Sequence, residues 1–396
     1  MEKATQQQIK EHNRNLVLKT LLENDLISRA DIARSTHLTR TTVSEIVSDL
    51  ISESLIREAG LGSSSGGKSP ILLGVVDDSR YLIGLDLAHN QFSGAIVNLG
   101  GELRETVSLP VNPQDGDGAL QLVYEILDRL VEAQIQPLVG IGIGAPGLVN
   151  TATGVVVNAV NLDWKDLPLA SLLEERYRMP VRVLNDSQAA ALGEYTYGAE
   201  RVGDENLIVV NARHGIGAGV LIDGRLFQGD GGGAGEIGHV VVVPEGGLLC
   251  RCGNYGCLET VASAQAIVTR LRTLAGDFPD TLLPKDPQSI SLVEVEQAFR
   301  AGDSLTEGIV LDAGRYLGLA LSGLVGILNI QNIVLTGDMT RFGEKWLGAI
   351  QDSMSRSTLF GLARDTRISV GGLYGNAIIL GASALIWTNY SMLFNQ

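Results

Sequence analysis

The sequence predicts two structural units: a small helical module with a two-stranded wing over residues 1–76, and a two-lobed α/β body over residues 77–396. The first 75 residues contain three helical patterns followed by a loop rich in glycine and serine. After residue 80, one order of strands and helix occurs twice. A chain of 396 residues also exceeds the ~100–200 residues of one ordinary domain.

The charges are distributed unevenly. The chain has 30 basic and 45 acidic residues; residues 1–75 hold nine of each sign, so the remainder carries the whole net charge of −15. An acidic body repels phosphate backbones, so nucleic acid would contact only the N-terminal module. The longest nearly uncharged apolar stretch, residues 317–330, has 14 residues, whereas a membrane-spanning helix needs ~20. The polar N-terminus also lacks a signal-peptide core, so we expect a cytoplasmic protein without membrane contact.

Three helices are predicted before residue 53. The first has apolar residues at helical spacing from Ile9 to Leu22, and Ser28, three residues before Asp31, begins the second as a capping box. A third begins near Thr39 and has an apolar inner face (Val43, Ile46, Val47, Leu50). A short helix, a tight turn and a helix with a polar first turn are typical of a helix-turn-helix. Its candidate DNA contacts are Arg40, Thr41, Thr42 and Ser44, and the alternative is a capped helical hairpin with a solvated face.

A wing is predicted after the third helix. Residues 55–58 and 71–75 are expected to form two short strands, and the loop between them, residues 60–70, carries Lys68 as its only charge. A basic residue at such a tip can reach phosphates or the minor groove of DNA. The alternative is a plain interdomain linker.

The body is predicted to contain a duplicated unit. Strands at 81–88, 94–98 and 103–109 precede a helix at 118–133 and a buried strand at 138–147. The same order follows with strands at 207–211, 217–222 and 225–227, a helix at 311–330 and a strand at 333–337. Two such lobes facing a cleft describe the sugar-kinase and actin architecture, in which a ribonuclease H-like unit is duplicated. We expect the lobes to divide near residues 190–200.

All three cysteines, Cys250, Cys252 and Cys257, lie within eight residues, and His239 precedes the first by eleven. In a reducing compartment this spacing favours a metal site over disulfides. Three thiolates and one imidazole favour Zn²⁺, and four protein ligands leave no open position, so the zinc would be structural. The alternative is three free cysteines beside a core histidine.

Polar side chains near this loop suit a ligand with hydroxyl groups. Glu236 and Glu259 flank the cysteines, so a metal loop over residues 236–259 would hold both in place. Asn185 and Asp186 follow a predicted buried strand at 181–184, and such a pair at a strand end can bind adjacent hydroxyls. Asp186 could also act as a general base or as a helix N-cap.

The segments LNDSQAAALGE, HGIGAGVLIDGRLFQGDGGGAGEIGH and CRCGNYGCLE resemble the ROK family, which contains sugar kinases and sugar-responsive repressors. The segment from SRADIARSTHLTRTTVSEIVSDL to SSSGGKSP is similar to the repressor branch, which includes xylose and N-acetylglucosamine repressors. The resemblance implies zinc on the Cys₃His set and a homodimer or higher oligomer that presents two winged modules to a two-fold operator. It also implies sugar contacts from Asn161, Asn185, Asp186, Glu236, His239 and Glu259.

Three departures from the family's kinases lie on the nucleotide side. The kinase loop reads Asp-x-Gly-Gly-Thr, whereas this chain has Asp86-Leu87-Ala88-His89-Asn90. Arg213-His214 stands where the kinases carry Gly-Thr, and Gly337-Asp338 replaces a Gly-Gly pair. The glycines let backbone amides approach phosphates, so their loss predicts that Asp186 is a vestigial base and that no residue is catalytic.

The sequence therefore predicts a repressor of carbohydrate-metabolism genes that binds operator DNA and a small sugar of the xylose, glucose or N-acetylglucosamine class. Sugar binding would change lobe closure or dimer geometry, and allosteric couplings of this kind are typically ~1–3 kcal/mol. The alternatives are an ATP-dependent hexose kinase of the same family, and a regulator relieved by a protein partner.

Overall fold

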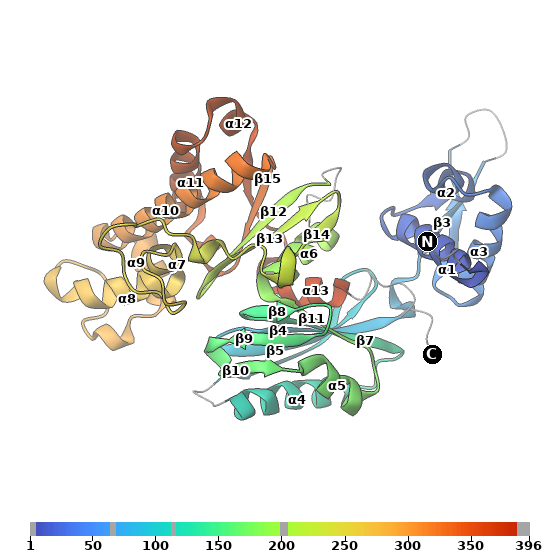
Figure 1. The fold of residues 1–396 in the computed structure, drawn as a ribbon, viewed down its shortest axis with the longest axis horizontal. Helices are drawn as coiled ribbons and strands as arrows, with labels where there is room; N and C mark the ends of the chain where they lie inside the picture. Colours follow the sequence, from blue (N-terminus) through green and yellow to red (C-terminus); the bar gives the residue numbers. More distant parts are fainter. Residues whose placement is uncertain (1–4, 64–68, 112–115, 199–204, 386–396) are drawn as a thin grey trace.

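The computed structural model describes residues 5–63, 69–111, 116–198 and 205–385. Figure 1 shows the N-terminal module at one end of the molecule, joined to a two-lobed body. Lobe 1 is built mainly from residues 77–198, and lobe 2 from residue 205 onward.

The N-terminal module is a winged helix-turn-helix, as predicted. Its three strands pair antiparallel in the order β1-β3-β2, and its helices bury the predicted apolar face of the third helix. Ser28 and Thr39 cap the second and third helices by accepting hydrogen bonds from the N–H groups of Asp31 and Thr42. The two-residue strand β1 was not predicted, because two residues carry no alternation. The elements are α1 (Gln6–Leu22), β1 (Ile27–Ser28), α2 (Arg29–Thr36), α3 (Arg40–Ser52), β2 (Ile56–Leu61) and β3 (Ile71–Val75).

Lobe 1 contains a five-stranded sheet in the order β11-β7-β4-β5-β6, with parallel pairing of β11, β7 and β4. A small antiparallel sheet, β10-β9-β8, lies at its edge and was not predicted, because its strands have three to five residues. The elements are β4 (Tyr81–Leu87), β5 (Gln91–Asn98), β6 (Leu103–Pro110), α4 (Gly116–Glu132), β7 (Leu138–Ala145), β8 (Leu148–Asn150), β9 (Val155–Ala159), β10 (Trp164–Leu167), α5 (Leu169–Tyr177) and β11 (Val181–Asn185), with 3₁₀ turns at Asp77–Ser79 (η1) and Val160–Leu162 (η2).

Lobe 2 repeats the plan with a sheet in the order β14-β13-β12-β15-β16. The turn between β13 and β14 is Asp223-Gly224, a pair typical of tight hairpins, and both residues have positive φ. The elements are β12 (Leu207–Ala212), β13 (Ile216–Ile222), β14 (Arg225–Phe227), α7 (Glu259–Ala262), α8 (Ala264–Leu274), α9 (Leu292–Arg300), α10 (Ser304–Leu328), β15 (Asn332–Thr336), α11 (Gly343–Ser357), α12 (Phe360–Asp365) and β16 (Arg367–Val370), with 3₁₀ turns at Asp230–Gly232 (η3), Ile237–His239 (η4), Ala275–Asp277 (η5), Pro287–Ser289 (η6) and Asp338–Phe342 (η7).

Two helices join the lobes. The helix α6 (Asp186–Tyr197) follows lobe 1's last strand, and α13 (Ala377–Ala384), which the short turn η8 (Tyr374–Asn376) precedes, returns from the end of the described chain to pack on α6 and on the lobe 1 sheet (Figure 1). The approach is close: a Cβ on Gly381 would lie 1.7 Å from the Ala189 carbonyl oxygen, and one on Gly84 would lie 2.1 Å from that of Ile379. Small residues therefore let α13 sit against both neighbours.

In the described part of the chain, α10 is the one helix that is long and apolar enough to cross a bilayer by length and composition. It begins seven residues earlier than predicted, where Asp303 accepts a hydrogen bond from the Thr306 N–H and caps it. Its inner face, including Leu317, Leu321 and Val325, packs into the core of lobe 2. A core helix of this kind passes the same test of length and composition.

Candidate functional site

A cleft of about 850 Å³ lies between the lobes, at the carboxyl ends of strands from both sheets. Its lining includes all six residues for which the sequence analysis predicted sugar contact, and we call this set the clamp. Lobe 1 and α6 supply Asn161, Asn185 and Asp186; the candidate metal loop of lobe 2, residues 236–259, supplies Glu236, His239 and Glu259. The structure therefore brings together residues that are up to 98 positions apart in the sequence (161 to 259).

Asn185, rather than Asp186, caps helix α6. Its Oδ1 accepts hydrogen bonds from the N–H groups of Ser187 (2.9 Å) and Gln188 (3.3 Å), and its Nδ2 donates to the Gly147 carbonyl (3.0 Å). The capping role considered for Asp186 is therefore wrong. These bonds fix the amide of Asn185, which leaves Asp186 as the freer polar group of the pair.

Asp186 is the first residue of α6 and lines the cleft. Its Oδ1 accepts hydrogen bonds from the Ser187 N–H (2.6 Å) and hydroxyl (3.0 Å), whereas Oδ2 has no hydrogen-bond partner among the described residues. Burial and the nearby Asp86 carboxylate raise the pKa of Asp186 to about 6, although Arg213 and the Ser187 bonds oppose the rise. The carboxyl group can therefore accept a hydroxyl proton near neutral pH.

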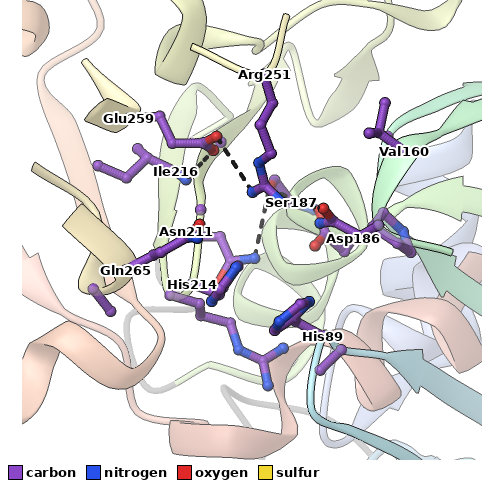
Figure 2. Close-up of a pocket in the computed structure, with 18 of the residues that line it drawn as sticks. His89, Val160, Asp186, Ser187, Asn211, His214, Ile216, Arg251, Glu259 and Gln265 are labelled. Atoms are coloured by element: carbon purple, nitrogen blue, oxygen red, sulfur yellow. Dashed lines mark hydrogen bonds and ion pairs between the residues drawn. The ribbon is translucent and has the colours of Figure 1, made fainter. Parts of the chain in front are cut away.

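The two glutamates of the clamp approach from lobe 2. Burial, Asp186 and Glu259 raise the pKa of Glu236 to about 7, and its Oε2 lies 3.8 Å from Nε2 of His239. Glu259 accepts a hydrogen bond from the Ile216 N–H (3.3 Å) at the start of β13 (Figure 2). Glu259 is thus held beside β13, and Glu236 lies beside the predicted metal ligand His239.

The predicted metal ligands lie close together. The ligand atoms of His239, Cys250, Cys252 and Cys257 are all within 4.8 Å of one another. Nδ1 of His239 is 3.6 Å from Sγ of Cys250, and Sγ of Cys252 is 3.6 Å from Sγ of Cys257. Tetrahedral zinc with bonds of about 2.0–2.3 Å needs ligand separations of roughly 3.5–3.8 Å, so this donor set fits the ion.

The cysteines lie on a narrow hairpin. Isolated bridges join Val241 to Cys257 and Leu249 to Tyr255, and the Cys250 N–H donates to the Asn254 carbonyl at 2.7 Å. Gly256 has φ +72°, and a Cβ there would lie 1.9 Å from the Val243 carbonyl oxygen. The hairpin therefore requires glycine between its ligands.

Arg251 is a cleft residue that sequence reasoning missed. It lies between the ligands Cys250 and Cys252, its NH1 donates to Oδ1 of Asn161, and its NH2 lies 3.8 Å from Glu259 (Figure 2). Asn211 was also missed; it is buried and donates to Ser187 Oγ at 3.5 Å. Only the position of Arg251 between two metal ligands, in a loop flanked by clamp residues, could have indicated its role.

The loops that replace the kinase phosphate loops meet across the cleft. The rings of His89 and His214 stack with centroids 3.8 Å apart and an interplanar angle of 15° (Figure 2). Burial lowers the pKa of His214 to about 4 and also lowers that of His89, so both rings are uncharged at neutral pH. Two bulky rings thus lie where the kinase pattern has small residues.

The candidate DNA-binding surface is the first turn of α3. Arg40, Thr41 and Ser44 are exposed, Thr42 is half-buried, and none of the four belongs to the module core. Lys68, predicted to contact DNA from the wing, lies outside the described residues.

Known proteins resemble this chain along most of its length. Residues 82–389 match the ROK family, and residues 11–57 match the winged helix-turn-helix DNA-binding family. A xylose repressor of Caldicellulosiruptor bescii is 32% identical over 386 residues, which cover 96% of each chain.

Two solved structures extend the comparison. A ROK family transcriptional regulator, described as a homologue of the E. coli MLC protein, aligns with a TM-score of 0.84 at 29% identity and covers 97% of this chain and 98% of its own. A ROK family glucokinase from Streptomyces griseus, solved with glucose and AMPPNP, has a TM-score of 0.71 at 30% identity and covers 77% of this chain and 98% of its own. The family match, the repressor relative and the shared fold together establish that the chain belongs to the ROK family.

Proposed function

We propose that this protein is a transcriptional repressor whose affinity for operator DNA is set by a small sugar bound in the clamp. The observation that carries the proposal is the combination, in one chain, of a winged helix-turn-helix with a cleft whose clamp carboxylates are in place. On the nucleotide side, Arg213 and His89 stand where the kinase loops carry glycines, and His214 stands where they carry a threonine. This arrangement favours sugar binding without phosphoryl transfer, and the full-length repressor relative supports it.

Contacts run from the clamp to the DNA-binding module through α6. The helix begins at Asp186 in the cleft, and at its other end the Tyr197 ring packs on Gly101, where a Cβ would lie 2.5 Å from the ring. Burial raises the pKa of Tyr195, and the charges of Glu23, which follows α1, and of Glu205 raise it further. Twelve residues of helix span about 18 Å, so α6 carries motion at the clamp to the turn at Gly101 that Tyr197 contacts.

The turn between β5 and β6, which Tyr197 contacts at Gly101, lies against the segment that connects the module to the body. The Leu99 N–H donates to the Asp77 carbonyl, and the Val76 N–H donates to the Leu55 carbonyl of the module, each at 2.9 Å. Arg104 donates to both carboxylate oxygens of Asp78, at 2.6 and 2.8 Å. We call these contacts around Asp77, Asp78 and Arg104 the brace. We propose that the brace converts a change in the cleft into a change in module orientation.

The direct test is fluorescence anisotropy with a labelled duplex from upstream of the protein's own gene, at fixed salt, titrated with xylose, glucose and N-acetylglucosamine. We expect specific binding that one sugar shifts about 5- to 150-fold, the range of ordinary allosteric couplings. Specific binding that no sugar shifts would favour regulation by a protein partner. ATP-dependent phosphorylation of a sugar would instead support the kinase alternative.

Arg40→Ala is expected to weaken operator binding about tenfold or more, because a base contact is worth ~1–3 kcal/mol. Lys19→Ala is the matched control: Lys19 lies on α1, pairs with Glu23 just beyond that helix, and its loss removes the same charge without changing α3. Equal losses in the two variants, measured by anisotropy over a range of salt, would show a general charge effect and contradict the assignment of α3.

Arg104→Gln is expected to leave sugar affinity within about twofold of the wild type while reducing the effect of sugar on DNA affinity severalfold, because Asp78 then loses its ionic partner at the brace. Arg129→Gln, which breaks the Glu125 pair on α4, is the control. Full sugar regulation in Arg104→Gln, read from paired sugar and DNA titrations, would exclude the brace as the connection.

We also propose that His239, Cys250, Cys252 and Cys257 hold a structural Zn²⁺, that the protein acts in the cytoplasm, and that it binds a two-fold operator as a homodimer or larger oligomer. Light scattering coupled to size exclusion would give the oligomeric state.

A further inference from the structure

One ion pair crosses from lobe to lobe inside the cleft. NH1 of Arg213, at the end of β12, donates to Oδ2 of Asp86, on β4, at 2.8 Å. The Asp86 side chain is 5% exposed and that of Arg213 is 23% exposed, so water screens the pair weakly. Nε of Arg213 also lies 3.9 Å from Asp338 of its own lobe. The pair is therefore a strong link between segments 127 residues apart.

The surroundings of Arg213 favour this placement. Gly337 has φ +95°, and a Cβ there would lie 2.6 Å from Cγ of Arg213, so glycine is needed beside the arginine. Burial raises the pKa of Asp86, and the charge and hydrogen bond of Arg213 oppose that rise. A second contact between the lobes lies nearby. His89, three residues after Asp86, stacks its ring on that of His214, which directly follows Arg213.

We propose that Asp86, Arg213, His89 and His214 form an interlobe clasp that sets the resting closure of the sugar cleft. The guanidinium of Arg213 thereby joins two loops that would bind phosphate in a sugar kinase of this fold. Because the clamp is divided between the lobes, the clasp pre-positions its two halves and lowers the cost of ordering them around a sugar. Arg213 is thus a positioning residue for ligand binding.

The clasp can be tested without DNA or sugar, so its failure is separate from a failure of the proposed repressor function. In Arg213→Gln we expect hydrogen exchange at the amides of residues 88–90 and 213–215 to rise about tenfold, and the radius of gyration from small-angle scattering to increase. Exchange in α4, within lobe 1, should not change. Arg272→Gln is the matched control, since Arg272 also lines the cleft but donates to the Ile290 carbonyl (2.9 Å) within lobe 2.

A second comparison guards against misfolding, because Arg213→Gln leaves a buried carboxylate without its cation. Asp86→Asn with Arg213→Gln removes both charges, and we expect this double variant to fold and to show the same local exchange increase as either single variant. Such non-additivity identifies a shared interaction. His89→Ala should give a smaller increase in the same two loops.

Exchange and scattering that are unchanged in Arg213→Gln, or equal to those in Arg272→Gln, would overturn the proposal. Additive effects in the double variant would also overturn it, because Asp86 and Arg213 would then act separately.

Discussion

Asp186→Asn is expected to remove the response to sugar while leaving operator binding intact. The Oδ2 atom of Asp186 lines the cleft without a hydrogen-bond partner in the described structure, so it is free to accept from a ligand hydroxyl. A hydrogen bond to a charged group contributes ~1.5–3 kcal/mol, so we expect sugar affinity to fall roughly 10- to 150-fold. Calorimetry with the effective sugar and anisotropy with the operator measure the two properties separately.

The same substitution is expected to stabilise the protein. The pKa of Asp186 is about 6 in the folded state and 3.8 without the fold, so the folded state binds the proton more tightly and stability falls as pH rises between these values. Asparagine avoids this cost; because the cleft is open to water, we expect a gain of about 1–2 kcal/mol at pH 7. The gain should disappear below about pH 4, which denaturant titrations at several pH values would show.

Asp163→Asn is the control, because Asp163 is exposed and its positive φ suits asparagine. Loss of operator binding in Asp186→Asn would contradict the clamp role and indicate a structural one. Lower stability than the wild type at pH 7 would contradict the burial of an ionised carboxylate. Wild-type sugar affinity should also weaken below pH 6, where Asp186 gains a proton.

Elements with a strong local signal were predictable. Capping at Ser28 and Thr39 is decided within three residues, and β4 and β12 consist mostly of aliphatic residues. The packing of α13 on α6 was not predictable, because it depends on glycines and alanines brought together from distant segments. Residues 207–211 and 333–337 were predicted as strands, but their pairing as neighbours in one sheet is a product of the fold.

In the candidate site, too, some features could be predicted from local sequence, whereas others depend on distant segments that the fold brings together. The clustering of the candidate metal ligands could be predicted because their spacing defines a compact loop. The capping role of Asn185 could not be separated from that of Asp186, since both residue types cap helices and only the backbone decides. The Asp86–Arg213 pair joins residues 127 positions apart, and their sequence neighbours carry no sign of it. Sequence thus predicted the chemistry, and the fold determined which groups meet.

Loss of the proposed zinc is expected to weaken both stability and sugar binding, because the loop that would bind it, residues 236–259, connects two clamp glutamates. Glu236 precedes the ligand His239 by three residues, and Glu259 follows Cys257 by two. Cys252 is exposed whereas Cys250 and Cys257 are buried, so Cys252→Ser removes a ligand with little change in packing. We expect this variant to lose at least about 2 kcal/mol, or several degrees in Tm, together with about tenfold in sugar affinity.

Zinc content and chelation separate the metal from the side chain. The wild type should contain one zinc per chain by elemental analysis, and a chelator should lower its Tm to that of Cys252→Ser, because a ligand bound only by the folded state adds stability by mass action. The chelator should not change the variant further. Asn254→Ser, an exposed change on the same hairpin, should behave as the wild type. Equal zinc content and equal Tm in Cys252→Ser and the wild type would contradict the metal site, whereas a Tm loss that chelation does not reproduce would assign the effect to packing.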